Sequence, residues 1–162
     1  MKGKADSKQP APEAQLRTFV DKLDPKNQKL FKSVRAALRK RFPTANELAY
    51  DYPSSLVVGY APSDKGIQSV VAISARADGV QLFFNQGPKL PDPKKLLQGS
   101  AKQVRFIQLD SATRLAHPDV KALIAAAEDV ADVALPSTGK GSLIIKSDGA
   151  KKKKAKAKAK KK

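Results

Sequence analysis

The sequence predicts an α+β domain, a small two-layer sandwich in which two N-terminal helices and one C-terminal helix cover a curled, antiparallel-rich sheet of about five strands. Apolar residues recur at helical spacing in residues 13–41 and again in residues 118–134. Between these segments the hydrophobic period changes from about 3.6 residues to 2, which is typical of strands. Strands that follow one another across short turns favour antiparallel pairing.

Two consecutive helices are expected over residues 13–23 and 25–41. Asp24 is expected to accept hydrogen bonds from the first free N–H groups of the second helix, and Pro25 suits its first position. Pro43 stops this helix. The second helix has an apolar face formed by Leu30, Phe31, Val34, Ala37 and Leu38.

Five segments alternate apolar and polar residues and are expected to be strands: residues 47–51, 55–60, 68–77, 80–85 and 103–109. Asp78 and Gly79 are the strongest turn signal, because this pair favours a type I′ hairpin. A two-residue turn at these positions places Ala75 opposite Leu82 on one face of the sheet.

The remaining segments flank the last helix. Residues 87–99 are rich in proline and are expected to hold one helical turn at residues 94–97. His117 is expected to begin a helix over residues 118–134. Residues 141–146 contain three consecutive aliphatic residues that are costly to expose, so they are expected to form either an edge strand or an ordered arm against the domain.

The chain divides into a disordered leader (1–12), a folded domain (13–135), a linker or packed arm (136–150) and a lysine-rich tail (151–162). It contains no cysteine, which excludes disulfides and thiolate metal sites. The N-terminus has no apolar signal segment, and no apolar run is long enough to span a membrane. We therefore expect a soluble, cytoplasmic protein, associated with the nucleoid if the source is a bacterium.

The last twelve residues carry nine of the chain's seventeen net positive charges. Lysines this close repel one another, so the tail is expected to be extended and solvated. Such a tail binds polyanions, because each neutralised phosphate releases a counterion. The alternatives are a solubilising tail or a nuclear address. The expected nucleic-acid-binding residues are Lys151, Lys152, Lys153, Lys154, Lys156, Lys158, Lys160, Lys161 and Lys162.

Catalytic and metal chemistry find little support in the sequence. His117 is the single histidine, and no nucleophile elbow is visible. A zinc or transition-metal site is difficult to assemble without further imidazole or thiolate ligands. Residues 137–142 superficially suggest a phosphate loop but lack its spacing, so we interpret them as a linker. We expect no enzymatic activity, no cofactor and no metal site.

All three tyrosines lie within residues 50–60, on or beside predicted strands. Tyrosines with an apolar body and a polar tip suit either a pocket wall or the boundary of the core. Asp51 is expected to pair with Lys102 or Arg105. The candidate pocket residues are Tyr50, Asp51, Tyr60, Asn85, Lys102 and Arg105.

Several of these segments carry a resemblance to a known family: Phe42 and Pro43 after a basic helix, the Tyr50-Asp51-Tyr52 strand, and residues 83–93 and 97–106. They resemble the YdhG-like family, domain-of-unknown-function family 1801, over about residues 15–134. The resemblance implies a small α+β sandwich, and some relatives are described as frataxin-like iron chaperones. Iron delivery requires exposed acidic ligands, whereas the first helices here carry only Glu13, Asp21 and Asp24 among many basic residues. The tail resembles the Lys/Ala tails of linker histones.

The leading hypothesis is a non-enzymatic protein whose polybasic tail binds nucleic acid without sequence preference. The alternative is a domain that handles a small ligand or a metal such as iron, with an incidental tail. Under the nucleic-acid hypothesis, the folded domain would bind a further, unidentified small ligand or protein. Under the alternative, the folded domain would bind the small ligand or metal itself.

Overall fold

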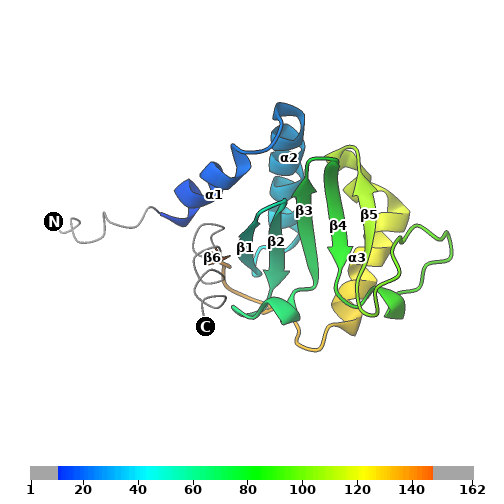
Figure 1. The fold of residues 1–162 in the computed structure, drawn as a ribbon. Helices are drawn as coiled ribbons and strands as arrows, with labels where there is room; N and C mark the ends of the chain where they lie inside the picture. Colours follow the sequence, from blue (N-terminus) through cyan, green and yellow to red (C-terminus); the bar gives the residue numbers. More distant parts are fainter. Residues whose placement is uncertain (1–10, 148–162) are drawn as a thin grey trace, which may run out of the picture.

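The computed structural model describes residues 11–147 and confirms the α+β prediction (Figure 1). Its helices are α1 (Pro12–Val20), α2 (Pro25–Arg41) and α3 (Pro118–Val130), with short 3-10 turns η2 (Gly66–Gln68), η3 (Gly87–Lys89) and η4 (Ala112–Ala116). Its strands are β1 (Asn46–Tyr52), β2 (Ser55–Ala61), β3 (Val71–Arg76), β4 (Gly79–Phe84), β5 (Arg105–Leu109) and β6 (Leu143–Ser147).

The described strands form one open sheet in the order β5-β4-β3-β2-β1-β6. Strands β1 to β5 pair as antiparallel neighbours, whereas β6 pairs with β1 in parallel. Of the two arrangements expected for residues 141–146, the edge strand is therefore the one adopted. It begins two residues later than predicted and reaches Ser147.

The helices cover one face of the sheet and leave the other open. Figure 1 shows α2 and α3 behind the strands, with α1 beside the edge formed by β1 and β6. Val58, Ile73, Leu82 and Ile107 are fully buried on the covered face. The helix residues in the same core include Phe31, Val34 and Leu38 from α2, and Val120, Leu123 and Ile124 from α3. At roughly 1.5–3 kcal/mol for each fully buried apolar side chain, this layer is the main source of stability.

The predicted register of the β3–β4 hairpin was wrong by two residues. Ala75 lies opposite Val80, and Arg76 lies opposite Gly79, so Ala77 and Asp78 form the turn. Gly79 adopts a φ of 135°, whereas Asp78 keeps a negative φ, which excludes a type I′ turn. A shift of two residues preserves the side-chain alternation, so the prediction still assigned each side chain to the correct face.

Two helix ends also differ from the prediction. Helix α1 ends at Val20, because Pro25 forces an extended Asp24 (ψ 150°) and the chain must first turn. Asp24 makes no side-chain capping bond, contrary to expectation. Helix α3 ends at Val130. Glu128, Asp129 and Asp132 lie near this end, and their negative charges interact unfavourably with the negative end of the helix dipole.

The expected helical turn at residues 94–97 is absent. Instead the carboxylate of Asp92 accepts from the backbone N–H of Leu96 and of Leu97, both at 2.8 Å. An aspartate that bonds the backbone ahead of it competes with helix formation. His117, by contrast, begins α3 as predicted, with its Nδ1 accepting from the N–H of Asp119 at 3.2 Å.

Candidate functional site

The open face of the sheet is crossed by two rows of paired residues. One row runs through Leu48, Gly59, Ala72, Phe83 and Phe106. The other runs through Tyr50, Val57, Ser74, Gln81 and Gln108. In both rows the central strands β2 and β3 carry small or short side chains, and the largest side chains lie towards the outside.

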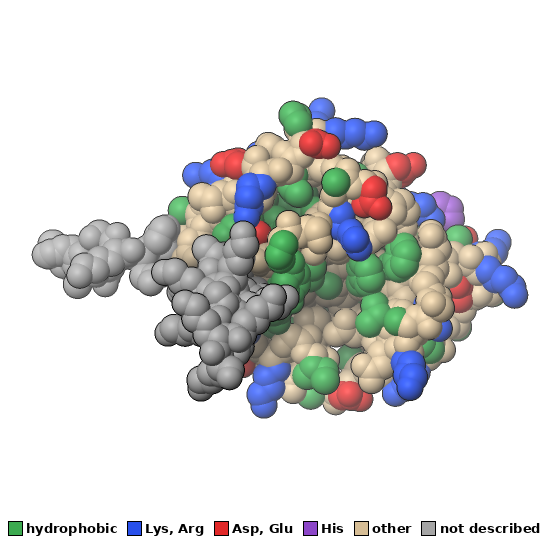
Figure 2. Space-filling model, in the orientation of Figure 1, with side chains coloured by type: hydrophobic (Ala, Val, Ile, Leu, Met, Phe, Trp, Pro, Cys, Tyr) green, Lys and Arg blue, Asp and Glu red, His purple; other side chains and the backbone are tan. Residues whose placement is uncertain are grey.

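Aromatic rings stack in pairs on both sides of this face. The Tyr50 and Tyr52 rings lie 5.8 Å apart and nearly parallel, at 10°. The Phe83 and Phe106 rings lie 5.1 Å apart at 28°. All four residues are half-buried. Because short side chains separate the two pairs, the face is concave, and Figure 2 shows it as a hollow with hydrophobic side chains at its sides.

The loop around η2 borders one end of this hollow. A Cβ on Gly66 would lie 2.2 Å from the hydroxyl of Tyr50, and a Cβ on Gly59 would lie 2.5 Å from the Ser69 Oγ. Ile67, between these contacts, is 84% exposed. Figure 2 shows lysine and arginine side chains at several points around the hollow, interspersed with acidic ones.

The nine tail lysines lie outside the described residues, but the point from which the tail departs is known. Strand β6 ends at Ser147, which pairs with Tyr50 at the edge of the open face. Lys151 follows four residues later. The described part of the chain thus ends beside Tyr50.

The predicted pocket residues do not converge. Tyr50 lies on the open face, whereas Asp51 and Tyr60 lie on the covered face. Arg105 is on β5, which three strands separate from β1. Lys102 lies in the loop before β5, and Asn85 directly follows β4.

The pairing expected for Asp51 was also wrong. Its Oδ2 accepts from the Nζ of Lys22 at 2.7 Å. Arg105 donates instead to the backbone carbonyl oxygens of Ala101 and of Val104, the latter at 2.9 Å. The sheet order explains the error, because residues on β1 and β5 cannot approach one another across three strands.

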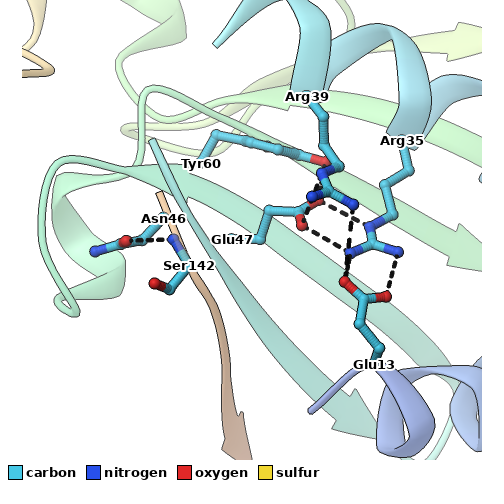
Figure 3. Close-up of polar contacts among 7 residues, drawn as sticks. All are labelled: Glu13, Arg35, Arg39, Asn46, Glu47, Tyr60 and Ser142. Atoms are coloured by element: carbon cyan, nitrogen blue, oxygen red, sulfur yellow. Dashed lines mark hydrogen bonds and ion pairs between the residues drawn. The ribbon is translucent and has the colours of Figure 1, made fainter. Parts of the chain in front are cut away.

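A buried polar cluster centred on Glu47 lies where α1 and α2 meet β1 (Figure 3). The Glu47 carboxylate is 6% exposed and accepts from Arg35 Nε at 2.9 Å, Arg35 Nη2 at 2.8 Å and the Tyr60 hydroxyl at 2.7 Å. Arg35 also binds the carboxylate of Glu13 through Nη1 at 3.1 Å and Nη2 at 2.8 Å. Arg39 lies 3.7 Å from both carboxylates.

This cluster shifts the ionisation of its members. The hydrogen bond from Arg35 lowers the pKa of Glu13, against the opposing effect of burial. Burial, followed by the negative charge of Glu47, raises the pKa of Tyr60 well above its usual value. The arginines thus favour a charged Glu13, while the protein favours a neutral Tyr60 hydroxyl that donates to Glu47.

Replacing Tyr60 with phenylalanine should therefore have a pH-dependent cost. Near pH 7 we expect the Tyr60→Phe variant to lose about 1.5–3 kcal/mol of unfolding free energy, the usual worth of a hydrogen bond to a charged group. A raised folded pKa gives stability that is present below about pH 10 and declines by about 1.4 kcal/mol per pH unit above it. Urea unfolding of both proteins from neutral to alkaline pH should give curves that converge, and a constant difference would contradict this account.

A cleft of about 320 Å³ opens beside the cluster. It lies between the C-terminal end of α2 and residues 139–143, with Arg39 and Lys140 as its cations and Glu47 and Tyr60 in its wall. Lys140 is exposed. The segment interpreted as a linker is therefore a wall of this cleft, with Gly141 N donating to the Pro43 carbonyl oxygen at 3.1 Å.

Sequence reasoning missed Glu47 as the partner of Tyr60 and Arg35 as the partner of Glu47. The available signal was the position of Glu47 in its strand, since it alternates with Leu48 and shares a face with Ala49 and Asp51. An acidic residue at a core-facing position requires a buried cation or donor. Nothing in the local sequence identified Arg35 among the basic residues of α2 as that cation.

The described part of the chain offers no ready metal site. Between residues 11 and 147, no group of three or more His, Cys, Asp or Glu side chains is arranged to hold a metal ion. Glu13 and Glu47, which share Arg35, direct their oxygens at arginine rather than at an open site. No helix within the same range combines the length and apolar character needed to cross a membrane.

No family model, curated protein or solved structure matches this chain. The resemblance to the YdhG-like family therefore stays a prediction.

Proposed function

We propose that this protein binds nucleic acid without sequence preference through the lysines of residues 151–162. The observation that carries the proposal is the charge density of that segment, nine lysines in twelve residues. Lysine ammonium groups are point charges without the planar fork that reads base edges, so the contacts are to phosphates. The parallel strand β6 is compatible with the proposal, because it brings Ser147, four residues before Lys151 in the sequence, to the sheet edge.

The test is binding to a random-sequence DNA duplex across a salt series, with the full chain and with a chain ending at Ala150. If all nine lysines engage the duplex, log K should fall against log[salt] with a slope of roughly −8. The shortened chain retains a net charge of +8, from 23 Lys and Arg against 15 Asp and Glu, spread over its surface. We expect it to lose most of the affinity and most of the slope. Equal affinity and slope for the two chains would refute the proposal.

A matched control separates charge from chain length. Replacing the nine tail lysines with arginine preserves the charge and should preserve the slope, whereas replacing them with glutamine should match the truncation. Loss of binding in the arginine variant would indicate recognition of lysine itself, for example by a protein receptor.

A second candidate function is favoured by the cleft beside α2. Its two cations, Arg39 and Lys140, would suit a small anionic ligand. A thermal-shift screen of anionic metabolites, with inorganic phosphate as the simplest probe, tests this function. A ligand that raises Tm should lose its effect in the Arg39→Ala and Lys140→Ala variants, and a flat response to every anion would count against the site.

A further inference from the structure

We infer that the open face of the sheet binds the unpaired bases of a single-stranded nucleic acid, while the lysine tail binds its phosphates. This inference rests on the proposed function and names the class of nucleic acid that the protein prefers. It depends on the concave face described above, which the tail proposal does not use.

The stacked rings are the first argument. A nucleobase is a flat ring that stacks on aromatic side chains whatever its identity, and single strands expose such rings whereas a duplex stacks them internally. Tyr50 and Tyr52 on one side, with Phe83 and Phe106 on the other, offer two such platforms. Between them the central strand β3 carries only the short side chains of Ala72 and Ser74.

Polar groups beside the rings are the second argument. The Nε2 of Gln81 donates to the Oε1 of Gln108 at 3.0 Å, next to the Phe83–Phe106 pair in the neighbouring row. Amide groups can donate to and accept from the edges of unstacked bases. The face therefore combines ring stacking with amides, as expected for a surface that binds bases.

Net charge favours a nucleic acid over a second copy of this chain as the partner of the open face. A second copy of this chain carries the same net charge of +17 and the same tail, so joining two open faces would bring two polybasic segments together. A nucleic acid strand has the opposite charge. Ser147, which pairs with Tyr50, precedes the first tail lysine by only four residues, so one strand of nucleic acid can reach both the tail and the open face.

Tyrosine fluorescence tests the inference in the unaltered protein. The chain has no tryptophan and three tyrosines, of which Tyr60 is fully buried, so Tyr50 and Tyr52 report on the open face. We expect oligothymidylate to quench this emission at saturation and a blunt duplex of equal length to leave it unchanged. Quenching that is absent with both, although both bind, would overturn the inference.

Ring replacement gives an independent test. The Tyr52→Leu and Phe106→Leu variants keep an apolar side chain but lose the aromatic face, and each should weaken oligothymidylate binding by roughly 5- to 100-fold. Duplex binding should stay unchanged. The matched Tyr52→Phe and Phe106→Tyr variants keep a ring and should bind like the parent. Equal affinity of all four variants for oligothymidylate would also overturn the inference.

The two proposals fail differently. If truncation at Ala150 leaves all binding intact, the tail proposal fails. If truncation removes binding but the ring variants bind single strands like the parent, the tail proposal stands and the open face is ruled out as the site that binds bases. Light scattering on the same proteins tests whether a second copy of the chain binds the open face instead. A dimer that the leucine variants dissociate would assign the face to a second copy and overturn the inference.

Discussion

The Arg35→Ala variant should lose about 3–5 kcal/mol of unfolding free energy, the cost of breaking a buried ion pair from one side. The guanidinium of Arg35 joins two carboxylates and is only 15% exposed. Without it, Glu47 stays buried and keeps the Tyr60 hydroxyl and the more distant Arg39 as partners. The aliphatic part of Arg35 also leaves the interface between α1 and α2.

Arg39 provides the matched control, one turn further along the same helix. Its side chain is 48% exposed and its ion pairs are 3.7 Å long, so the Arg39→Ala variant should lose less than about 1 kcal/mol. Urea unfolding at neutral pH measures both. The Arg35→Met/Glu47→Leu double variant should recover most of the loss, because it removes both buried charges together. Similar small losses for Arg35→Ala and Arg39→Ala would contradict a central role of Arg35.

The sheet faces were predictable, whereas the partners across them were not. Alternation alone placed Ala75 and Leu82 on one face of their hairpin, and a register error of two residues did not alter that assignment. The stacking of Phe83 on Phe106 depends on which residues of β4 and β5 pair. A long loop of irregular structure connects these strands, so no turn signal fixes their register.

Residues 141–146 illustrate a different limit. Their aliphatic run required burial, which the sequence revealed, but parallel pairing with β1 depends on a partner nearly one hundred positions earlier. Long-range partners are chosen by tertiary packing rather than by local propensity. The same reason explains why the six predicted pocket residues lie apart in the structure. They were grouped by residue type, without knowledge of the strand order.

Gly141 should be the most sensitive position of this C-terminal segment. A Cβ at Gly141 would lie 1.7 Å from the carbonyl oxygen of Ala45 and 2.9 Å from the backbone N of Asn46, so no side-chain rotation can relieve the collision. The Gly141→Ala variant must move this segment away from β1. We expect it to weaken the contact in which Glu47 N donates to the Ser142 carbonyl oxygen at 2.8 Å.

The expected cost of Gly141→Ala is about 2–3 kcal/mol, since partly buried Leu143 and Ile145 lose contact with the core. Exposed Lys140 supplies the control, and the Lys140→Ala variant should change stability by less than about 0.5 kcal/mol. Hydrogen exchange localises the effect: the Glu47 amide should exchange faster in Gly141→Ala, while amides between β3 and β4 stay protected. The tail charge is unaltered, so the salt slope of duplex binding should persist even though its attachment is loosened. An unchanged Glu47 exchange rate would show that β6 tolerates the extra methyl group and that the close packing of Gly141 is not what holds it to the sheet.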